Sequence, residues 1–360
     1  MNIERLGWNP FFEKYMSLYE ADGYRPARVF AEYTHIYKLY TEYGEVMGEL
    51  SGKMRFESTQ PEHFPSVGDW VMADIRPDEN RATIHAVLPR QSKLSRKATG
   101  PGQMQEQILA TNINTIFFIN SLSSDFNIRR IERYLILGWE SGATPVIILS
   151  KADMCQNVQD AIQQVEAIAP GTAIHAISAV DGAGIDALAP YLREGNTIAL
   201  LGLSGVGKST LINYLAGNEV QKTKEVRDWD GRGRHTSSSR EIFFLPQGGL
   251  MIDTPGIREI VMWTGEEGLS ETFEDVEKFA KNCHFHDCRH KNEPGCAVQA
   301  AVNEGLLDEK RIENYIKLQK ELHFLDRKHK RQITTHEKKN GKLDTERIKI
   351  PASRYRESDE

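Results

Sequence analysis

The chain is poor in cysteine and has no long apolar run, and both absences narrow what it can be. Four cysteines in 360 residues are too few for a disulfide scaffold. No segment approaches the roughly 20 apolar residues that cross a bilayer, and residues 1–10 lack the basic-then-apolar pattern of a secretion signal. With 39% hydrophobic and 27% charged residues, the composition is that of a soluble globular protein. We therefore expect a cytoplasmic, monomeric protein of several domains that has no membrane partner.

The net charge of −6 hides an uneven distribution along the chain. Residues 311–350 contain 12 lysines and arginines against 6 aspartates and glutamates, so this stretch carries +6 and the remainder −12. A basic segment on an acidic body can still bind phosphate groups. We expect a basic tail over 326–360.

The N-terminal part alternates in short segments separated by turns that contain glycine or proline. These segments cover 29–33, 36–41, 45–51, 69–75 and 82–88. Five short strands predict a small closed barrel like the oligonucleotide-binding (OB) fold over 28–98, after an N-terminal extension over 1–27. Arg90, Lys93, Arg96 and Lys97 follow as a basic connector. A purely structural barrel is the alternative, because a fold does not establish a ligand.

Residues 110–262 instead alternate apolar strands with helical segments. The expected strands cover 115–120, 145–150, 173–178, 197–202, 241–245 and 250–253, and the clearest helices 128–141 and 158–169. This order predicts an α/β domain with a mostly parallel sheet, which binds ligands at the carboxyl ends of its strands.

A phosphate-binding loop follows one of these strands. Residues 202–209 match the pattern G-x-x-x-x-G-K-[ST] and precede a helix over 210–216. In such loops backbone N–H groups surround the phosphates, the lysine reaches the β and γ oxygens, and the final hydroxyl binds Mg²⁺. The site residues predicted here are Gly202, Ser204, Gly205, Val206, Gly207, Lys208, Ser209 and Thr210. A chance glycine loop is the alternative, which both flanks argue against.

A second phosphate-side motif ends the strand over 250–253. Asp253 is placed to hold Mg²⁺, and the N–H of Gly256 can face a γ-phosphate. On its own the turn would be unremarkable. After the phosphate loop it completes a nucleotide site.

The base is predicted to be guanine. Ser150-Lys151-Ala152-Asp153 resembles the [N/T]-K-x-D guanine motif, in which the carboxylate accepts from N1–H and the exocyclic amine and so rejects adenine. Ser178-Ala179 resembles the companion motif. Ser150 replaces the usual asparagine, whose longer side chain braces the two loops, and this departure bears on nucleotide affinity. An ordinary loop at the end of a strand is the alternative.

The motifs occur in an unusual order, because the guanine motifs precede the phosphate loop. The α/β domain therefore reads as circularly permuted. The second switch, at Asp253 to Gly256, then leads directly into the C-terminal domain, which provides a route from nucleotide state to partner binding.

Hydrolysis requires a residue that positions water. Ile257 stands where many GTPases have glutamine, so that residue cannot act. Thr236 fits the first-switch threonine that contacts Mg²⁺ and the γ-phosphate, and His235 is the nearest side chain able to orient water. For His235 an ordinary loop residue is the alternative.

A metal site is predicted in a C-terminal helical domain over 268–325. Cys283, Cys288, His290 and Cys296 supply three thiolates and one imidazole, a closed tetrahedral set typical of structural zinc. His284 and His286 are expected to be bystanders, although one could replace His290. Free thiols are the alternative. A helix over 309–324 precedes a basic run, which beside a metal knuckle favours phosphate binding.

Together these features resemble the ribosome small subunit-dependent GTPase A family, the circularly permuted, zinc-containing GTPases of bacteria. The resemblance covers about residues 28–320 and rests on the barrel, the motif order, Gly233 to Thr236, the Asp253 turn and the Cys₃His set. It implies GTP/GDP, Mg²⁺ and one structural Zn²⁺ as ligands, and the 30S subunit with its 16S rRNA as partner. It further implies a checkpoint in late subunit maturation, hydrolysis stimulated by that subunit, and a role for His235.

Two other functions fit parts of the sequence. One is a GTP-dependent regulatory switch that does not act on ribosomes. The other is an RNA-binding assembly factor with a vestigial nucleotide site, against which the intact Lys208, Ser209 and Asp253 argue.

Overall fold

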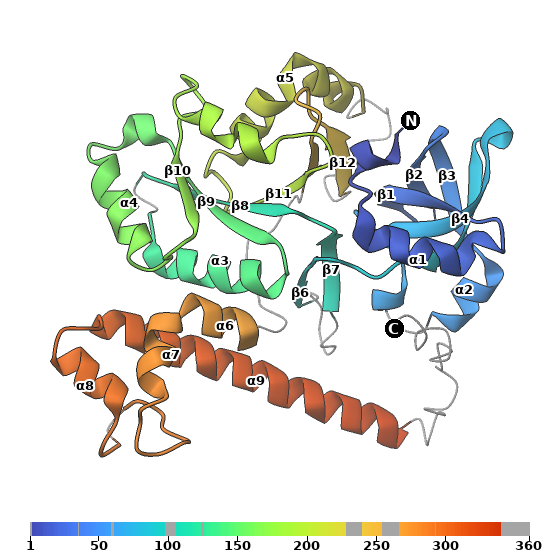
Figure 1. Ribbon diagram of the computed structural model, residues 1–360. Helices are drawn as coiled ribbons and strands as arrows, with labels where there is room; N and C mark the ends of the chain where they lie inside the picture. Colours follow the sequence, from blue (N-terminus) through green and yellow to red (C-terminus); the bar gives the residue numbers. More distant parts are fainter. Residues whose placement is uncertain are drawn as a thin grey trace.

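The computed structural model describes residues 2–34, 36–58, 61–97, 106–123, 126–227, 240–253, 266–291 and 293–339. Figure 1 shows a β-barrel, an α/β sheet beside it, and a group of C-terminal helices packed below the sheet. Within the described ranges, no helix is long and apolar enough to cross a membrane.

The barrel is closed and has five strands, as the sequence predicts. Its strands are β1 (Arg25–Tyr33), β2 (Ile36–Thr41), β3 (Gly44–Leu50), β4 (Trp70–Arg76) and β5 (Arg81–Val87). They pair in the order β1-β2-β3-β5-β4, and β4 pairs back to β1 to close the barrel. Inward-facing Val29, Leu39 and Ile84 fill the interior. Helix α2 (Gly52–Glu57) lies between β3 and β4.

The N-terminal segment packs against the barrel. The 3-10 helix η1 (Ile3–Leu6) leads into α1 (Pro10–Glu20), and the ring of Trp8 meets the ring of Trp70 edge-on at 4.8 Å between centroids. The buried Arg28 guanidinium donates to the carbonyls of Leu6, Gly68 and Asn112. Burial lowers the pKa of Arg28 to about 9, so the side chain still carries its charge at neutral pH. Arg28 thus fastens the N-terminal segment to the barrel and to the start of the α/β part.

The α/β sheet is mostly parallel, which confirms the predicted fold class. Its strands are β8 (Thr115–Ser121), β9 (Thr144–Ser150), β10 (Ala173–Ala176), β11 (Thr197–Leu201), β12 (Glu241–Phe244) and β13 (Leu250–Asp253). They lie in the order β10-β9-β8-β11-β13-β12, and only β12 is antiparallel to its neighbour β13. The strand that leads into the glycine loop, β11, is therefore central.

Helices cover both faces of this sheet because alternate strand residues point to opposite sides. On one face the ring of Phe118 stacks on that of Tyr134 in α3 (Ile128–Glu140). On the other, Phe117 and Ile119 share a cluster with Leu211 of α5 (Lys208–Arg227). Helix α4 (Val158–Glu166) and four 3-10 helices complete the described helical elements up to residue 253: η2 (Pro61–His63), η3 (Pro77–Glu79), η4 (Ala152–Met154) and η5 (Ile185–Tyr191).

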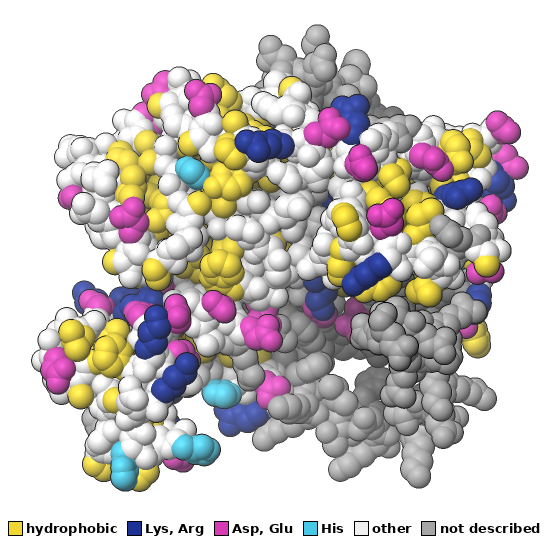
Figure 2. Space-filling model, viewed as in Figure 1, with side chains coloured by type: hydrophobic (Ala, Val, Ile, Leu, Met, Phe, Trp, Pro, Cys, Tyr) yellow, Lys and Arg dark blue, Asp and Glu magenta, His cyan; other side chains and the backbone are white. Residues whose placement is uncertain are grey.

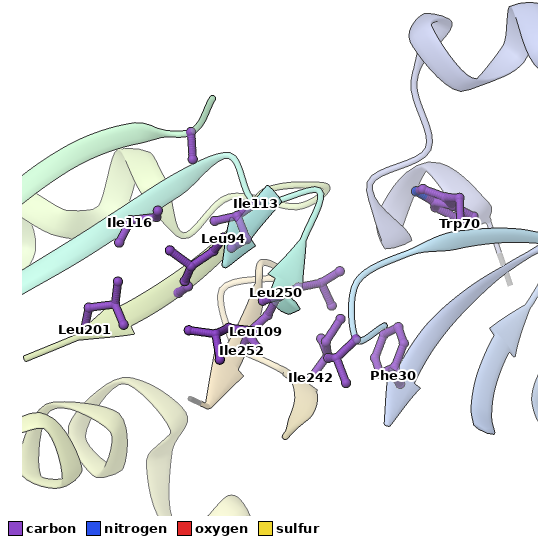
Figure 3. Close-up of a cluster of buried hydrophobic side chains, with 14 of the residues drawn as sticks. Phe30, Trp70, Leu94, Leu109, Ile113, Ile116, Leu201, Ile242, Leu250 and Ile252 are labelled. Atoms are coloured by element: carbon purple, nitrogen blue, oxygen red, sulfur yellow. The ribbon is translucent and has the colours of Figure 1, made fainter. Parts of the chain in front are cut away.

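The barrel and the α/β sheet form one structure through β12. Ala31 of β1 pairs with Glu241 of β12, so a single sheet of 11 strands runs through both parts. Figure 3 shows Phe30 of the barrel beside Ile242 of β12, within a buried cluster that extends to Trp70 on one side and Leu201 on the other. The two predicted domains therefore share one buried cluster, beside the separate cluster that fills the barrel interior.

The expected basic connector contains a strand that the sequence did not indicate. Residues 93–97 form β6 (Lys93–Lys97), which pairs with β7 (Glu106–Thr111) in a hairpin. The Arg90 guanidinium donates to both carboxylate oxygens of the buried Asp69, at 2.8 and 2.7 Å, and Lys93 pairs with Glu106 at 2.8 Å. Acidic partners distant in the sequence thus neutralise two of the four cations.

The C-terminal helices form a small domain that packs on α3. They are α6 (Glu266–Thr272), α7 (Glu274–Ala280), α8 (Ala297–Asn303) and α9 (Glu309–Lys339), the last longer than the sequence predicts. Phe273, Val276, Val298 and Tyr315 share their core. A side chain at Gly268 would place its Cβ 2.2 Å from the carbonyl oxygen of Ile136, so α6 and α3 approach with backbone in contact.

Candidate nucleotide site and metal centre

The glycine loop between β11 and α5 has the backbone that its sequence predicts. Gly205 and Gly207 have φ angles of 82° and 96°, in the left-handed region that favours glycine. A Cβ at Gly202 would lie 2.5 Å from the carbonyl oxygen of Ile119, so β8 also requires glycine there. The loop is consequently a compact turn that ends where α5 begins, at Lys208.

The polar groups of this loop gather at the N-terminus of α5. The Lys208 ammonium donates to the carbonyl oxygens of Gly202 and Leu203, each at 2.6 Å, and so lies against the loop. Ser209 and Thr210 are exposed in the first turn of the helix, and Ser204 is exposed in the loop. Val206 is buried and anchors the loop in the core. Helix N-termini of this kind favour anionic ligands.

The two predicted guanine motifs lie side by side. Ser150 ends β9, Lys151 adopts a left-handed backbone with φ of 58°, and the N–H of Ala152 donates to the carbonyl of Ile177 at 3.1 Å. Asp153 is exposed on the first loop. On the second loop Ser178 is buried and Ala179 is partly exposed. The Asp153 carboxylate, which is predicted to bind the guanine base, is thus accessible from solvent.

The structure brings the guanine motifs and the glycine loop to one edge of the sheet. Strands β8 to β11 are parallel, so their carboxyl ends meet there. The hydroxyl of Ser150 donates to the carbonyl of Val206 at 2.6 Å. The shorter serine therefore reaches the loop that the usual asparagine would brace.

Several predicted residues lie partly or wholly outside the described ranges. Asp253 ends β13, which is parallel to β11 beside it, and its backbone is described whereas its side chain is not. Gly256, His235 and Thr236 lie outside the described residues. Their roles stay predictions.

Sequence reasoning missed a contact that supports the second guanine loop. A Cβ at Gly182 would lie 2.7 Å from the hydroxyl oxygen of Tyr214 on α5, so helix and loop touch. The N–H of Ala183 donates to the carboxylate of Asp181, and this bond lowers the pKa of Asp181. The run Asp181-Gly182-Ala183-Gly184 is a turn signal that could have indicated the loop, but its partner Tyr214 is distant in sequence.

The four predicted metal ligands converge at the C-terminal domain. The ligand atoms of Cys283, Cys288, His290 and Cys296 all lie within 4.8 Å of one another. Nδ1 of His290 is 3.6 Å from the sulfur atoms of Cys283 and Cys296, which are 3.9 Å apart. A tetrahedral zinc with bonds of about 2.3 Å to sulfur has ligand–ligand edges of about 3.8 Å, so the set fits structural zinc.

The backbone around the metal site is held by its own hydrogen bonds. Glu293 accepts from the N–H groups of Arg289 and Lys291, and the side chain of Gln299 donates to the carbonyl of His290 at 2.7 Å. His290 has a left-handed φ of 56°, which turns the chain back toward Cys296 at the start of α8.

Burial shifts the pKa values of two of the predicted ligands. It lowers the pKa of His290, which favours the neutral imidazole that binds metals, and it raises the pKa of Cys288 to about 11. A bound cation would favour the thiolate. His284 and His286 are exposed and do not belong to the cluster.

A buried ionic network joins the metal-binding domain to the α/β part. Glu132 of α3 is fully buried, and its Oε1 is 2.8 Å from Nη1 of Arg311 in α9. The other face of that guanidinium pairs with Asp275 at 2.7 Å. Beside it, Arg133 and Glu321 form two parallel bonds of 2.8 and 2.7 Å. These ion pairs thus fix the position of the C-terminal domain relative to α3.

Models of known protein families match most of the chain. A family model described as RsgA GTPase matches residues 87–263, and one described as 50S ribosome-binding GTPase matches residues 197–340. The chain is 44% identical over 307 residues to "Small ribosomal subunit biogenesis GTPase RsgA 2" of Lactiplantibacillus plantarum, a match that covers 85% of this chain and 86% of that protein. It is also 44% identical to "Small ribosomal subunit biogenesis GTPase RsgA" of Syntrophotalea carbinolica, with 89% and 90% covered.

Solved structures agree with the fold. The chain is similar to YjeQ from Thermotoga maritima with a TM-score of 0.61 and 27% identity, over 83% of this chain and 98% of that one. It is similar to YloQ, described as a circularly permuted GTPase, with a TM-score of 0.60 and 24% identity, over 83% and 95%. This second likeness concerns the fold alone.

Proposed function

The chain belongs to the RsgA GTPase family, and we propose that it binds the small ribosomal subunit and couples GTP hydrolysis to late subunit maturation and its own release. The observation that carries the proposal is the meeting of the glycine loop with both guanine motifs at one sheet edge. We propose the small subunit as the partner because the relatives are named for small ribosomal subunit biogenesis.

In the proposed site, three loops bind different parts of the nucleotide. Residues 202–207 and the N-terminus of α5 bind the phosphates, and Lys208 places its charge at the β and γ oxygens, where negative charge develops during transfer. Asp153 accepts from the guanine, with Lys151 along the base and Ser178-Ala179 on its other edge. Mg²⁺, held by Ser209, Thr236 and Asp253, would neutralise phosphate charge when bound.

His235 is proposed to orient the attacking water. The support is its position in the sequence beside Thr236, together with the absence of a glutamine after Gly256. A His235→Ala protein that binds GTP normally but loses stimulated turnover would support this role. Unchanged stimulated turnover would exclude it.

The metal centre is proposed to act structurally. All four ligand positions are protein side chains, so the closed set leaves no coordination site for a substrate. Zinc there would hold the segment between α7 and α8 in place. It would thereby also fix the surface that this segment forms together with α9.

Phosphates of 16S rRNA are the proposed binding partner of the C-terminal domain. On the face shown in Figure 2, cationic and histidine side chains gather over this domain, interspersed with acidic ones. Exposed cations there include Lys281, Arg289, Lys291, Lys317 and Lys320. The sequence adds the basic residues of 326–360. Binding through phosphates predicts affinity that falls steeply as salt rises. We further propose that the protein acts in the cytoplasm as a monomer.

Co-sedimentation tests the partner. We expect the protein to pellet with small subunits in a non-hydrolysable GTP analogue, to do so less in GDP, and not to pellet with large subunits. Equal binding to both subunits, or to neither, would contradict the proposal. Absent binding combined with normal GTP affinity would favour a regulatory switch that does not act on ribosomes.

A further inference from the structure

The predicted metal ligand His290 has an unusual backbone conformation. Of the four ligands, all of which the structure describes, only His290 has a positive φ, at 56°. This left-handed region costs free energy for a residue that carries a Cβ, and glycine is the residue that usually occupies it. Contacts with other parts of the chain must therefore hold the backbone of His290 in this conformation.

The backbone of His290 matters for a metal because the ligand atom lies close to it. Nδ1 is 3.6 Å from the sulfur atoms of both Cys283 and Cys296. Only the Cα–Cβ and Cβ–Cγ bonds can rotate between this nitrogen and the backbone. A change of backbone angle at His290 therefore moves Nδ1 relative to the sulfurs, and the short side chain, which is held in a few staggered rotamers, has little freedom to compensate.

Two side chains hold the peptide group that follows His290, one at each edge. The N–H of Lys291 donates to Oε2 of Glu293 at 2.8 Å. On the opposite edge, the carbonyl of His290 accepts from Nε2 of Gln299 at 2.7 Å. Because a peptide group is planar, the two bonds fix its orientation and with it the ψ angle of His290. The other carboxylate oxygen of Glu293 accepts from the N–H of Arg289 at 3.2 Å, on the preceding side of the histidine.

We propose that Glu293 and Gln299 are positioning residues for the metal, which hold His290 in its left-handed conformation and so set the affinity for zinc. The inference rests on the proposed structural zinc site. Glu293 is not among the four converging ligands, and Gln299 gives its amide to a backbone carbonyl. Residues that orient a metal ligand in this way typically change metal affinity by about 10- to 100-fold.

Charge is the alternative explanation for an effect of Glu293, because a carboxylate attracts a cation without any hydrogen bond. Gln299 is neutral, so charge cannot explain an effect of its replacement. Glu304 provides a matched control for Glu293, since it is an exposed glutamate of the same domain, at the C-terminal end of α8. Replacing Glu304 by alanine removes the same atoms and the same charge without removing a bond to the backbone around His290.

The test measures the zinc dissociation constant of the full-length protein by competition with a chromophoric chelator. We expect Glu293→Ala and Gln299→Ala each to raise the constant about tenfold. Glu304→Ala should bind zinc as the wild type does. Circular dichroism of the zinc-loaded proteins reports whether the helices are intact, and either of the first two variants suffices if the other does not fold.

A double-mutant cycle tests whether the effect passes through His290. In a His290→Ala protein the imidazole is absent, so a residue that acts by orienting it has nothing left to orient. Adding Glu293→Ala or Gln299→Ala to that protein should therefore weaken zinc binding no further. A residue that merely supports the fold of the segment would weaken zinc binding by the same factor in both backgrounds.

Unchanged zinc affinity in a folded Glu293→Ala or Gln299→Ala protein, an equal loss in Glu304→Ala, or the same loss with and without His290 would each overturn the inference while the zinc site stands. A wild-type protein that binds no zinc would instead overturn the proposed zinc site, and the inference with it.

Discussion

At the scale of single residues, the proposed hydrolysis depends most directly on the charge of Lys208. Its ammonium lies on the phosphate loop, bonded to two carbonyls of that loop. In Lys208→Ala the loop backbone would remain but the charge that stabilises the transferring phosphoryl group would not. We expect turnover to fall by more than about a hundredfold. A steady-state assay of GTP hydrolysis at saturating GTP measures this, and near-normal turnover would refute the assignment of the site.

Arg311 provides a prediction about stability. It pairs with the fully buried Glu132 and with Asp275, and it also donates to the carbonyl of Thr272. Arg311→Met would leave Glu132 with fewer partners in a buried setting, and we expect a loss of about 3 kcal/mol in the free energy of unfolding. Urea unfolding measures the loss.

Arg133→Met is the matched control for that experiment. Arg133 bonds Glu321 in the same interface, but both side chains are partly exposed, at 26% and 29%. Its replacement should cost about 1 kcal/mol or less. Equal losses in the two variants would show that burial of Glu132 does not determine the strength of the interface.

At the residue scale, the sequence predicted local geometry where one short motif contains it, whereas the roles of the site residues stay predictions. The glycine loop has the left-handed backbone that its pattern requires, and the Cys₃His set converges as its spacing predicts. The bonds of Ser150 to Val206 and of Arg311 to Glu132 join residues far apart in sequence, and no local pattern contains them. The identities of the partners follow only from the folded sheet and helices.

At the scale of elements, β12 unites the barrel and the α/β sheet. It pairs with β13 on one side and β1 on the other, and Ile242 lies in the shared core. We expect the barrel and sheet to unfold in one calorimetric transition. Ile242→Ala should lower the midpoint of that transition without splitting it, at a cost of about 2–5 kcal/mol. Two transitions, with only one shifted, would show that the parts are independent.

The metal-binding segment between α7 and α8 gives a second prediction at this scale. His290 belongs to the cluster and His286 does not. Measured by elemental analysis, the wild-type protein and His286→Ala should each hold one zinc per chain, and His290→Ala should hold less. Chelation of zinc should increase hydrogen exchange in residues 281–296 and leave α3 protected. Full zinc in His290→Ala would exclude this ligand set.

Most elements were predictable because burial imposes a period on the sequence. The five barrel strands and the strands of the α/β sheet lie within a few residues of their predicted positions. Strand β6 was missed because Lys93, Ser95, Arg96 and Lys97 make it polar, and its pairing with β7 is what makes it a strand. The pairing of β1 with β12 was missed for a related reason, since the residues of neither strand carry a signal for a partner far away in the sequence.

At the scale of the whole molecule, the motif order connects the nucleotide site to the C-terminal domain. Strand β13 ends at Asp253, and α6 begins at Glu266 and packs on α3. The predicted second-switch motif begins at the end of β13 and continues into the segment before α6. We therefore expect a change there to act on a domain that the Glu132–Arg311 network fixes to the sheet. The barrel is joined on the other side through β12, directly after the segment that contains His235.

The most direct test of the account is GTP hydrolysis by the purified protein with and without small ribosomal subunits, with large subunits and ATP as controls. The account predicts slow hydrolysis by the protein alone and strong stimulation by small subunits only, with no turnover of ATP. Stimulation by large subunits instead, or a rate that neither subunit changes, would contradict a GTPase that acts on the small subunit.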